Sequence, residues 1–176
     1  EVESLRPLLS SGGKILLEKD ATWENLAAFS RSNSMKALSD FSFLHIASHF
    51  FADSISGRLC GLSLYEEDIF LDQLNELAPL PEMVTLSGCS STYIRTYPGD
   101  EPVGLPTTCL LAGAKSVIGS NWPVRDEFAS QFMAAFYQNY FSGLSPASAL
   151  ASTQRAFIAQ KNAIICWAGY SCIGKY

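Results

Sequence analysis

The sequence predicts a three-layer α/β fold, in which a mostly parallel sheet is flanked by helices and carries a small β-hairpin excursion. Short apolar or β-branched runs alternate along the chain with segments whose apolar residues recur at helical spacing. Several of these runs end in small residues, which is typical of buried strands that lead into loops. The chain has 176 residues, 48% of them hydrophobic, and is therefore long enough to bury a full core. We expect one domain over residues 14–176, preceded by a linker at residues 1–13.

The first elements form a predicted β-α-β unit. We expect a short strand at residues 14–17 and a helix that begins after Thr22, an N-cap residue, and runs to about residue 34. A second strand is expected at residues 43–49. This order favours a parallel pair of strands with a right-handed crossover.

A hairpin and the strand before Cys89 come next. Two apolar runs within residues 59–71 bracket a polar tip at 66–68, which indicates a β-hairpin. A short helix is expected at residues 72–78, ended by Pro79. The run that starts at Met83 is expected to be a strand that ends just before Cys89.

The last third of the chain predicts three helices and two strands. A helix at about residues 105–112 is expected to end at Gly113, followed by a strand at 115–120. A long helix from Asp126 has an aromatic stripe, which we interpret most simply as core, with an interface for another part of the protein as the alternative. Ser145 begins a further helix to about residue 161, and residues 167–174 form a closing strand. The aromatic stripe consists of Phe128, Phe132, Phe136 and Tyr140.

Composition excludes several classes of protein. A net charge of −5 without a cluster of Lys and Arg argues against nucleic-acid binding. No apolar run approaches the roughly 20 residues of a membrane span. The first residue is not methionine and no signal peptide follows it, so we expect a piece of a longer protein. Five cysteines without CxxC pairing favour the reducing cytoplasm over a disulfide scaffold. Three of them have apolar neighbours and are expected to fill core: Cys109, Cys166 and Cys172.

A cysteine and a histidine follow two of the predicted strands. Cys89 ends the run that starts at Met83, and His49 ends the run at 43–49. The carboxyl ends of parallel strands share one edge of a sheet, so the two side chains are expected to face one crevice. A free thiol has a pKa near 8.5 and needs a base or a positive field to react near neutrality, which a histidine supplies. His45 is expected to be a buried, hydrogen-bonded neighbour.

The backbone around Cys89 suits a tetrahedral intermediate. Gly88 and Ser90 have little bulk, so a substrate carbonyl can approach the thiol. The main-chain N–H of Cys89 and the backbone at Phe50 are the candidate donors of an oxyanion hole.

Three other interpretations of these residues compete with a catalytic role. A cysteine at a strand end or a histidine in an apolar strand is often just packed. A zinc site would use His45, His49, Cys60 and Cys89, but the HxxxH spacing here falls on a strand and no CxxC completes the set. A nucleotide-binding domain lacks its Gly-rich loop. We therefore expect no metal and no cofactor.

Four segments together carry a family resemblance. Residues 45–49 (HIASH), 86–91 (LSGCSS), 111–118 (LAGAKSVI) and 121–126 (NWPVRD) resemble, in order, the motifs of CHAT-domain proteases, which are relatives of separase and the caspases. Shorter matches at 136–137, 143–145, 149–150 and 167–169 extend the likeness to about residues 14–174.

The resemblance implies a caspase-like fold and a cysteine endopeptidase with a His/Cys dyad. His49 would be the base and Cys89 the nucleophile. Such domains often lie at the carboxyl end of larger proteins, behind helical repeats or other sensors, and cleave a dedicated protein substrate when triggered. Many relatives have glycine after the catalytic histidine, whereas this chain has Phe50. The alternative function is a catalytically inactive caspase-like interaction module.

The resemblance also suggests candidates for substrate binding. Asp126, in the motif that contains Trp122, is similar to an acidic residue with which separase-like enzymes recognise a basic residue before the scissile bond. A carboxylate there would pair with Arg or Lys. Asp126 is equally well explained as a helix N-cap. Asp100 and Glu101, in the loop after Cys89, are rival candidates.

Overall fold

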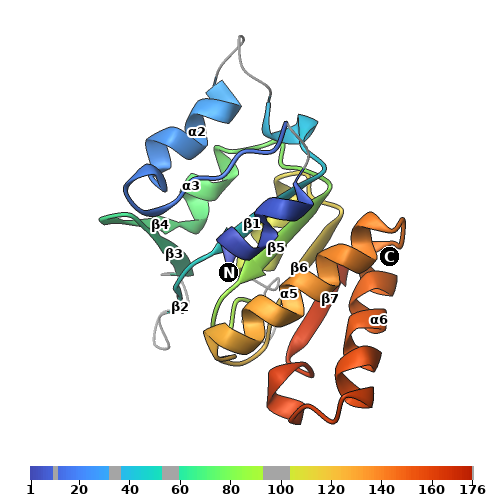
Figure 1. Cartoon of the computed structure of the whole chain (residues 1–176). Coiled ribbons are helices and arrows are strands. Elements are labelled where there is room, and N and C mark those ends of the chain that lie inside the picture. The colour runs from blue at the N-terminus through green and yellow to red at the C-terminus, as the bar shows by residue number, and fades with distance from the viewer. Residues whose placement is uncertain (10–11, 32–36, 53–59, 93–103, 176) are drawn as a thin grey trace, which may run out of the picture.

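A computed structural model of the chain describes residues 1–9, 12–31, 37–52, 60–92 and 104–175. Its central sheet has the strand order β1-β5-β6-β7 (Figure 1). Strands β1, β5 and β6 are parallel, and β7 pairs antiparallel with β6. The predicted, mostly parallel sheet is thus confirmed. The strand bounds are β1 (Phe43–Ala47), β5 (Met83–Ser87), β6 (Ser116–Ser120) and β7 (Tyr170–Gly174).

Helices cover both faces of this sheet. Because side chains alternate along a strand, Val84 and Leu86 of β5 pack into one apolar cluster and Met83 into another. The first cluster is closed by α2 (Trp23–Arg31), α3 (Leu71–Asn75) and α4 (Leu105–Leu111). The second is closed by α1 (Val2–Leu5), α5 (Asp126–Phe141) and α6 (Pro146–Ala159). The three layers expected from the sequence are therefore present (Figure 1).

A second, antiparallel sheet follows β1. It consists of β2 (Phe50–Ala52), β3 (Cys60–Leu64) and β4 (Glu67–Phe70) in the order β2-β3-β4. Strands β3 and β4 form the predicted hairpin, and β2 adds a third strand. A carboxylate oxygen of Glu67 accepts a hydrogen bond from the Trp23 N–H at 2.6 Å, which ties this sheet to the start of α2.

Several helices begin or end at the capping residues that the sequence predicts. The Thr22 hydroxyl accepts a hydrogen bond from the Asn25 N–H at 3.2 Å, and that of Ser145 accepts one from the Ser148 N–H at 3.3 Å. Gly113, just after α4, has φ +110°, a left-handed conformation that favours glycine. These caps confirm the expected starts of α2 and α6 and the end of α4.

Some predicted elements differ in the structure. Residues 14–17 are not a strand, and no backbone hydrogen bond joins them to β1 within the described residues. Leu16 instead packs against the first apolar cluster, so its apolar character is satisfied by burial alone. Helix α3 is shorter than expected, and a 3₁₀ turn at Ile164–Cys166 precedes the closing strand. Within residues 1–13, expected as a linker, α1 buries Leu5.

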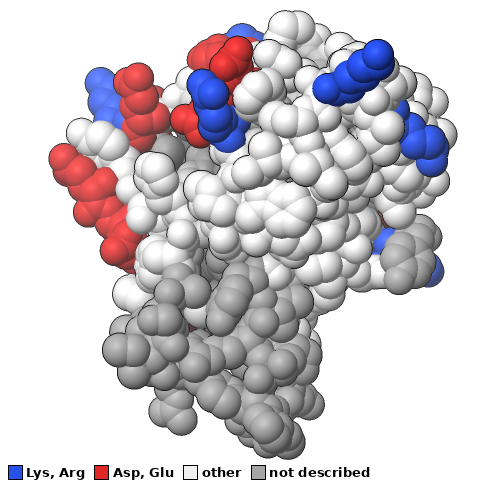
Figure 2. All heavy atoms as spheres, turned by 90° about the horizontal axis from the view of Figure 1, so that it is seen from below, with Lys and Arg blue, Asp and Glu red and all other residues white. Residues whose placement is uncertain are grey.

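Charge is spread thinly over the surface. On the face in Figure 2 most side chains are uncharged, and Lys and Arg occur singly. The described residues of this face therefore form no basic patch of the kind that binds nucleic acid.

No helix within the described ranges combines the length and the apolar character needed to cross a bilayer.

The second apolar cluster depends on Phe132. Its ring is fully buried and stacks on Tyr170 with the centroids 4.1 Å apart. We expect Phe132→Ala to lower the free energy of unfolding by about 3–5 kcal/mol, because it leaves a cavity between α5 and β7. Denaturant unfolding measures this change. Leu111→Ala is the control, since Leu111 is 81% exposed, and an equal loss there would contradict this account of the core.

Candidate active site

The pairing of β1 with β5 positions the two candidate catalytic residues. The register pairs Ala47 with Ser87, the last residues of the two strands, and the Ser48 N–H still donates to the Ser87 carbonyl at 3.2 Å. His49 and Cys89 each follow two residues after their paired strand end. The structure thus brings both to the same edge of the sheet, as the sequence predicts.

The turn that carries Cys89 requires glycine at position 88. A Cβ atom there would clash with the Ser48 carbonyl oxygen and with the ring of Phe50. Ser90 has φ +53°, a conformation that non-glycine residues seldom adopt. The chain therefore reverses sharply beneath the thiol, and the Cys89 side chain is exposed.

Phe50 does not fill the space beside the thiol. Its ring is half-buried, packs against the first apolar cluster and lies against Gly88. The Phe50 side chain thus occupies core space next to the turn that carries Cys89.

The main chain at His49 is held by the small sheet. The Ser63 N–H donates to the His49 carbonyl at 2.9 Å, and the Ser48 hydroxyl donates to the Ser63 carbonyl. The imidazole itself is exposed and forms no hydrogen bond with any described residue. The described part of the chain therefore leaves the ring open to a ligand.

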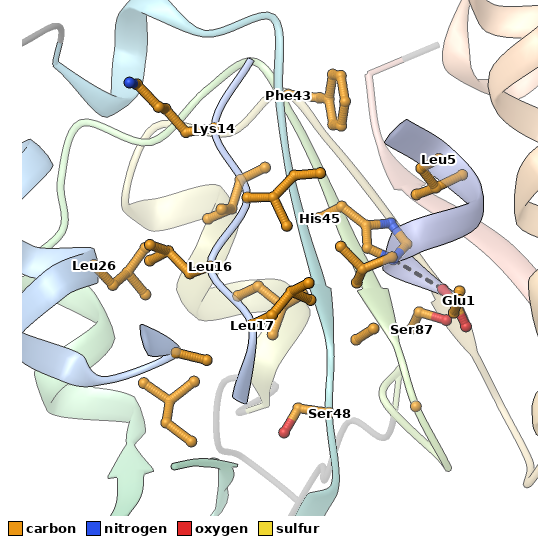
Figure 3. A pocket seen from close by; sticks show the side chains of 18 of the residues that line it. Glu1, Leu5, Lys14, Leu16, Leu17, Leu26, Phe43, His45, Ser48 and Ser87 are labelled. Atoms are coloured by element: carbon orange, nitrogen blue, oxygen red, sulfur yellow. Dashed lines mark hydrogen bonds and ion pairs between the residues drawn. The ribbon is translucent and has the colours of Figure 1, made fainter. Parts of the chain in front are cut away.

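Both side chains line one cavity of about 1130 Å³. The cavity extends from Cys89 and His49 along both sides of β1, and Figure 3 shows the part beside that strand. Leu16 and Leu17 lie on one side of β1, and Glu1, Leu5 and His45 on the other. No hydrogen bond joins His49 to Cys89 in the described residues, so the two groups line the same cavity without a hydrogen bond between them.

His45 belongs to a buried polar cluster on the α5 side of β1. One ring nitrogen, Nε2, lies 2.8 Å from a carboxylate oxygen of Glu1, and the other, Nδ1, lies 3.0 Å from the Tyr137 hydroxyl. That hydroxyl donates to Thr85 Oγ1 at 2.9 Å. The His45 side chain is only 5% exposed, which confirms the expectation of a buried, hydrogen-bonded neighbour.

The groups of this cluster change the pKa of the Glu1 carboxyl. Burial by itself would raise the pKa of the carboxyl, but the hydrogen bond from His45 and its charge, with a hydrogen bond from Ser87, lower the pKa overall. Sequence reasoning missed Glu1, Tyr137 and Thr85 as a group. The signal was present in β5, where Thr85 and Ser87 put polar groups on one face of an otherwise apolar strand.

The cysteines divide sharply by exposure. Cys89 is exposed, whereas Cys60, Cys109 and Cys166 are buried and Cys172 is half-buried. Burial raises the pKa of Cys109 to about 12, so that thiol stays protonated and inert. Cys89 is therefore the thiol that solvent and ligands reach.

The remaining predicted site residues have different positions. Asp126 lines the cavity with Cys89, but Trp122 does not. The Trp122 ring packs against Gly169, and its Nε1–H donates to the Ile165 carbonyl at 3.1 Å. The N-cap position of α5 is Arg125, and Asp126 is the first helical residue, so the interpretation of Asp126 as the N-cap is wrong. Asp100 and Glu101 lie outside the described residues.

Fold and site define an α/β domain with an exposed cysteine and a histidine at the ends of neighbouring parallel strands. The profile of the CHAT domain family matches residues 1–175. The chain belongs to the CHAT domain family.

Individual relatives cover only parts of the chain. Human tetratricopeptide repeat protein 28 is 31% identical over 102 residues, which is 54% of this chain and 4% of that protein. Two crystal structures of the Saccharomyces cerevisiae separase–securin complex, at 2.6 and 3.0 Å resolution, match with a TM-score of 0.47 each. They are 20% and 24% identical and cover 60% of this chain and 7% of theirs. The chain thus spans a small fraction of these proteins.

The Glu1–His45 pair predicts a dependence of stability on pH. Because the folded-state pKa of Glu1 lies below its ordinary value of 4.5, the carboxylate contributes stability that is present above pH 4.5 and lost as the pH falls through the folded-state value. We expect Glu1→Gln to cost about 1.5–3 kcal/mol at pH 7, since it removes a charged, buried hydrogen bond. The cost should shrink in acid.

Denaturant unfolding between pH 3 and 7 measures this effect. Glu24→Gln, on the exposed face of α2, is the matched control. An acid dependence of Glu1→Gln identical to that of the unmodified chain would contradict the role assigned to the pair.

Proposed function

We propose that this domain is a regulated cysteine endopeptidase that cleaves a specific protein substrate, with Cys89 as nucleophile and His49 as general base. One observation carries the proposal. The strand register puts an exposed histidine and the exposed cysteine at equivalent positions beyond β1 and β5, on one cavity. Membership of the CHAT domain family supports the same reading.

The chemistry follows from the two side chains. His49 takes the thiol proton of Cys89, and the thiolate sulfur attacks the carbonyl carbon of the scissile peptide bond. The C–N bond then breaks as His49 returns the proton to the leaving amine, which leaves a thioester on Cys89. Water, deprotonated by His49, hydrolyses the thioester and restores the thiol.

Main-chain donors suit the oxyanion in this proposal. The Cys89 N–H forms no hydrogen bond with the described residues, so it is available to a ligand. His49 and Ser63 share a hydrogen-bonded position in the β2–β3 ladder, so the next residue, Phe50, falls in a non-hydrogen-bonded pair with its N–H directed away from β3. These two N–H groups are the proposed oxyanion hole, and Gly88 keeps the approach to it clear.

A basic residue before the scissile bond is the proposed specificity. Three carboxylates, Glu1, Glu18 and Asp126, line the cavity with Cys89. Glu1 is already paired with His45, whereas Glu18 and Asp126 form no ion pair with the described residues. Asp126 follows β6, the strand that pairs with β5 in front of Cys89, so we assign to it the contact with an arginine or lysine of a substrate.

We propose that other parts of a longer protein regulate the domain. CHAT-type proteases often follow helical repeats or other sensors, and the name of the human relative includes tetratricopeptide repeats. We propose a sensor or repeat partner, in the same or another chain, that controls access of one dedicated protein substrate.

An inactive interaction module is the second candidate function. The observation that favours it is the lack of a hydrogen bond between His49 and Cys89, while Phe50 packs between their turns. A catalytic dyad often tightens only when substrate binds, so labelling of the thiol separates the two candidates.

Active-site labelling tests the protease. A peptide acyloxymethyl ketone is expected to modify Cys89 covalently, because a thiolate displaces its carboxylate leaving group. Intact-mass and peptide mass spectrometry should find no adduct in Cys89→Ala. In His49→Ala, labelling should be about 10²–10⁴-fold slower, the range for loss of a general base. Absence of labelling in both this domain and the triggered full-length protein would leave the interaction module.

The P1 preference is a separate prediction. Matched probes with a basic or an aliphatic P1 residue should differ in labelling rate, the basic probe being faster. Asp126→Asn should slow the basic probe about 10- to 100-fold, since a hydrogen bond to a charged group contributes about 1.5–3 kcal/mol. The aliphatic probe should be unaffected. Glu127→Gln is the control, because Glu127 is in the same turn but does not line the cavity. Equal effects of both variants would refute the role of Asp126.

A further inference from the structure

The hydroxyl of Ser91 ties the Cys89 turn to the strands on either side of it. It donates to the carbonyl of Leu86 in β5 at 2.5 Å and accepts from the N–H of Ser120 in β6 at 2.9 Å. We propose that Ser91 is a positioning residue that holds the turn so that the Cys89 thiol stays within reach of His49. This inference rests on the proposed function and adds a residue to it.

Burial makes the bridge strong. Ser91 is 1% exposed and Ser120 is 2% exposed, so water does not replace either hydrogen bond. Both partners of the hydroxyl are main-chain groups of β5 and β6, the two central strands of the sheet. The Ser91 hydroxyl therefore fixes the turn relative to the sheet, two residues after Cys89.

The turn needs such a restraint because its backbone is unfavourable. Ser90, between Cys89 and Ser91, has φ +53°, and a serine in this conformation persists only when its surroundings fix it. Thr92 supplies a second attachment, since its hydroxyl donates to the Asn121 side chain at 2.7 Å and its N–H to the Ser120 carbonyl at 3.1 Å. Ser90 is thus held in its strained conformation by the two residues that follow it, Ser91 and Thr92.

Gly119 gives the turn room to lie against β6. A Cβ atom at this position would come within 2.7 Å of Thr92 Cγ2 and 2.8 Å of Ser91 Oγ. Gly119→Ala is therefore expected to push the turn off β6 while the hydroxyl of Ser91 is retained. This second variant separates the position of the turn from the chemistry of the Ser91 side chain.

The test is the pH profile of Cys89 alkylation by iodoacetamide, followed at the Cys89 peptide by mass spectrometry. In the unmodified chain we expect a lowered profile, in which alkylation at pH 6.5 is faster than in His49→Ala, because His49 stabilises the thiolate. Ser91→Ala and Gly119→Ala should each slow alkylation at pH 6.5 about tenfold, toward the rate of His49→Ala, and change the rate little in strong alkali, where any exposed thiol is ionised.

Thr153→Ala is the matched control. Thr153 is also a fully buried hydroxyl with two partners, donating to the Ala149 carbonyl at 2.9 Å and accepting from the Asn139 side chain at 3.0 Å, but it lies on α6. Thr153→Ala should lower the free energy of unfolding about as much as Ser91→Ala does, and it should leave the alkylation profile of Cys89 unchanged. A merely structural role for Ser91 would make the two variants behave alike.

The outcomes separate the two proposals. A lowered profile that His49→Ala and Ser91→Ala both move supports the inference. A lowered profile that depends on His49 but is unchanged in Ser91→Ala overturns the positioning role and leaves the dyad. An ordinary thiol profile that His49→Ala does not alter overturns the dyad, and the positioning role with it.

Discussion

The parallel pairing of β1 with β5 is the constraint on which the rest of the structure depends. Val84 and Leu86 must face one apolar cluster and Met83 the other, so the core accepts only one register of the two strands. That register carries over into the loops, where His49 and Cys89 leave the sheet side by side. A shift of one residue would exchange the side chains of β5 between its two buried faces, so that each apolar cluster would receive the wrong residues. Core packing thus fixes the spacing of the candidate dyad.

The site combines a fixed backbone with unattached functional side chains. The main chain at His49 is anchored to the small sheet by Ser63, and the turn after Cys89 is anchored to β6 by Ser91. The contact of Phe50 with Gly88 joins the two anchored turns. The imidazole and the thiol, by contrast, are exposed. Such a site can bind a ligand without moving the backbone, which keeps the cost of ordering at binding low.

Sequence reasoning succeeded where a local pattern decides the structure. The strands β1, β5 and β6, the hairpin and the caps at Thr22 and Ser145 follow from apolar runs, turn residues and capping chemistry. It also selected an exposed cysteine and a histidine on one cavity. The expected strand at residues 14–17 failed because its apolar residues are half-buried without a ladder of hydrogen bonds, which no local pattern reveals.

The polar contacts of the site were beyond the reach of the sequence for a different reason. His45 meets Glu1 across 44 positions and Tyr137 across 92, so nothing local marks them as partners. The Ser91 bridge likewise depends on β6 lying beside β5. Asp126 shows the same limit at short range, because carboxylates are common both at N-caps and in the first helical turn, and only the backbone separates these positions.

The partners of each side chain also explain why one histidine and one cysteine suit chemistry and the others do not. His45 and His49 are four residues apart on one segment, but β1 ends between them. His45, within the strand, is enclosed by α1 and α5 and has both ring nitrogens engaged. His49, beyond the strand end, has its backbone anchored, and no described residue forms a hydrogen bond with its ring. The cysteines follow the same rule, since burial keeps Cys109 protonated while the turn at Gly88 exposes Cys89. The proposed pair therefore lies at the point where the strands end, because there the main chain is fixed and the side chains are exposed.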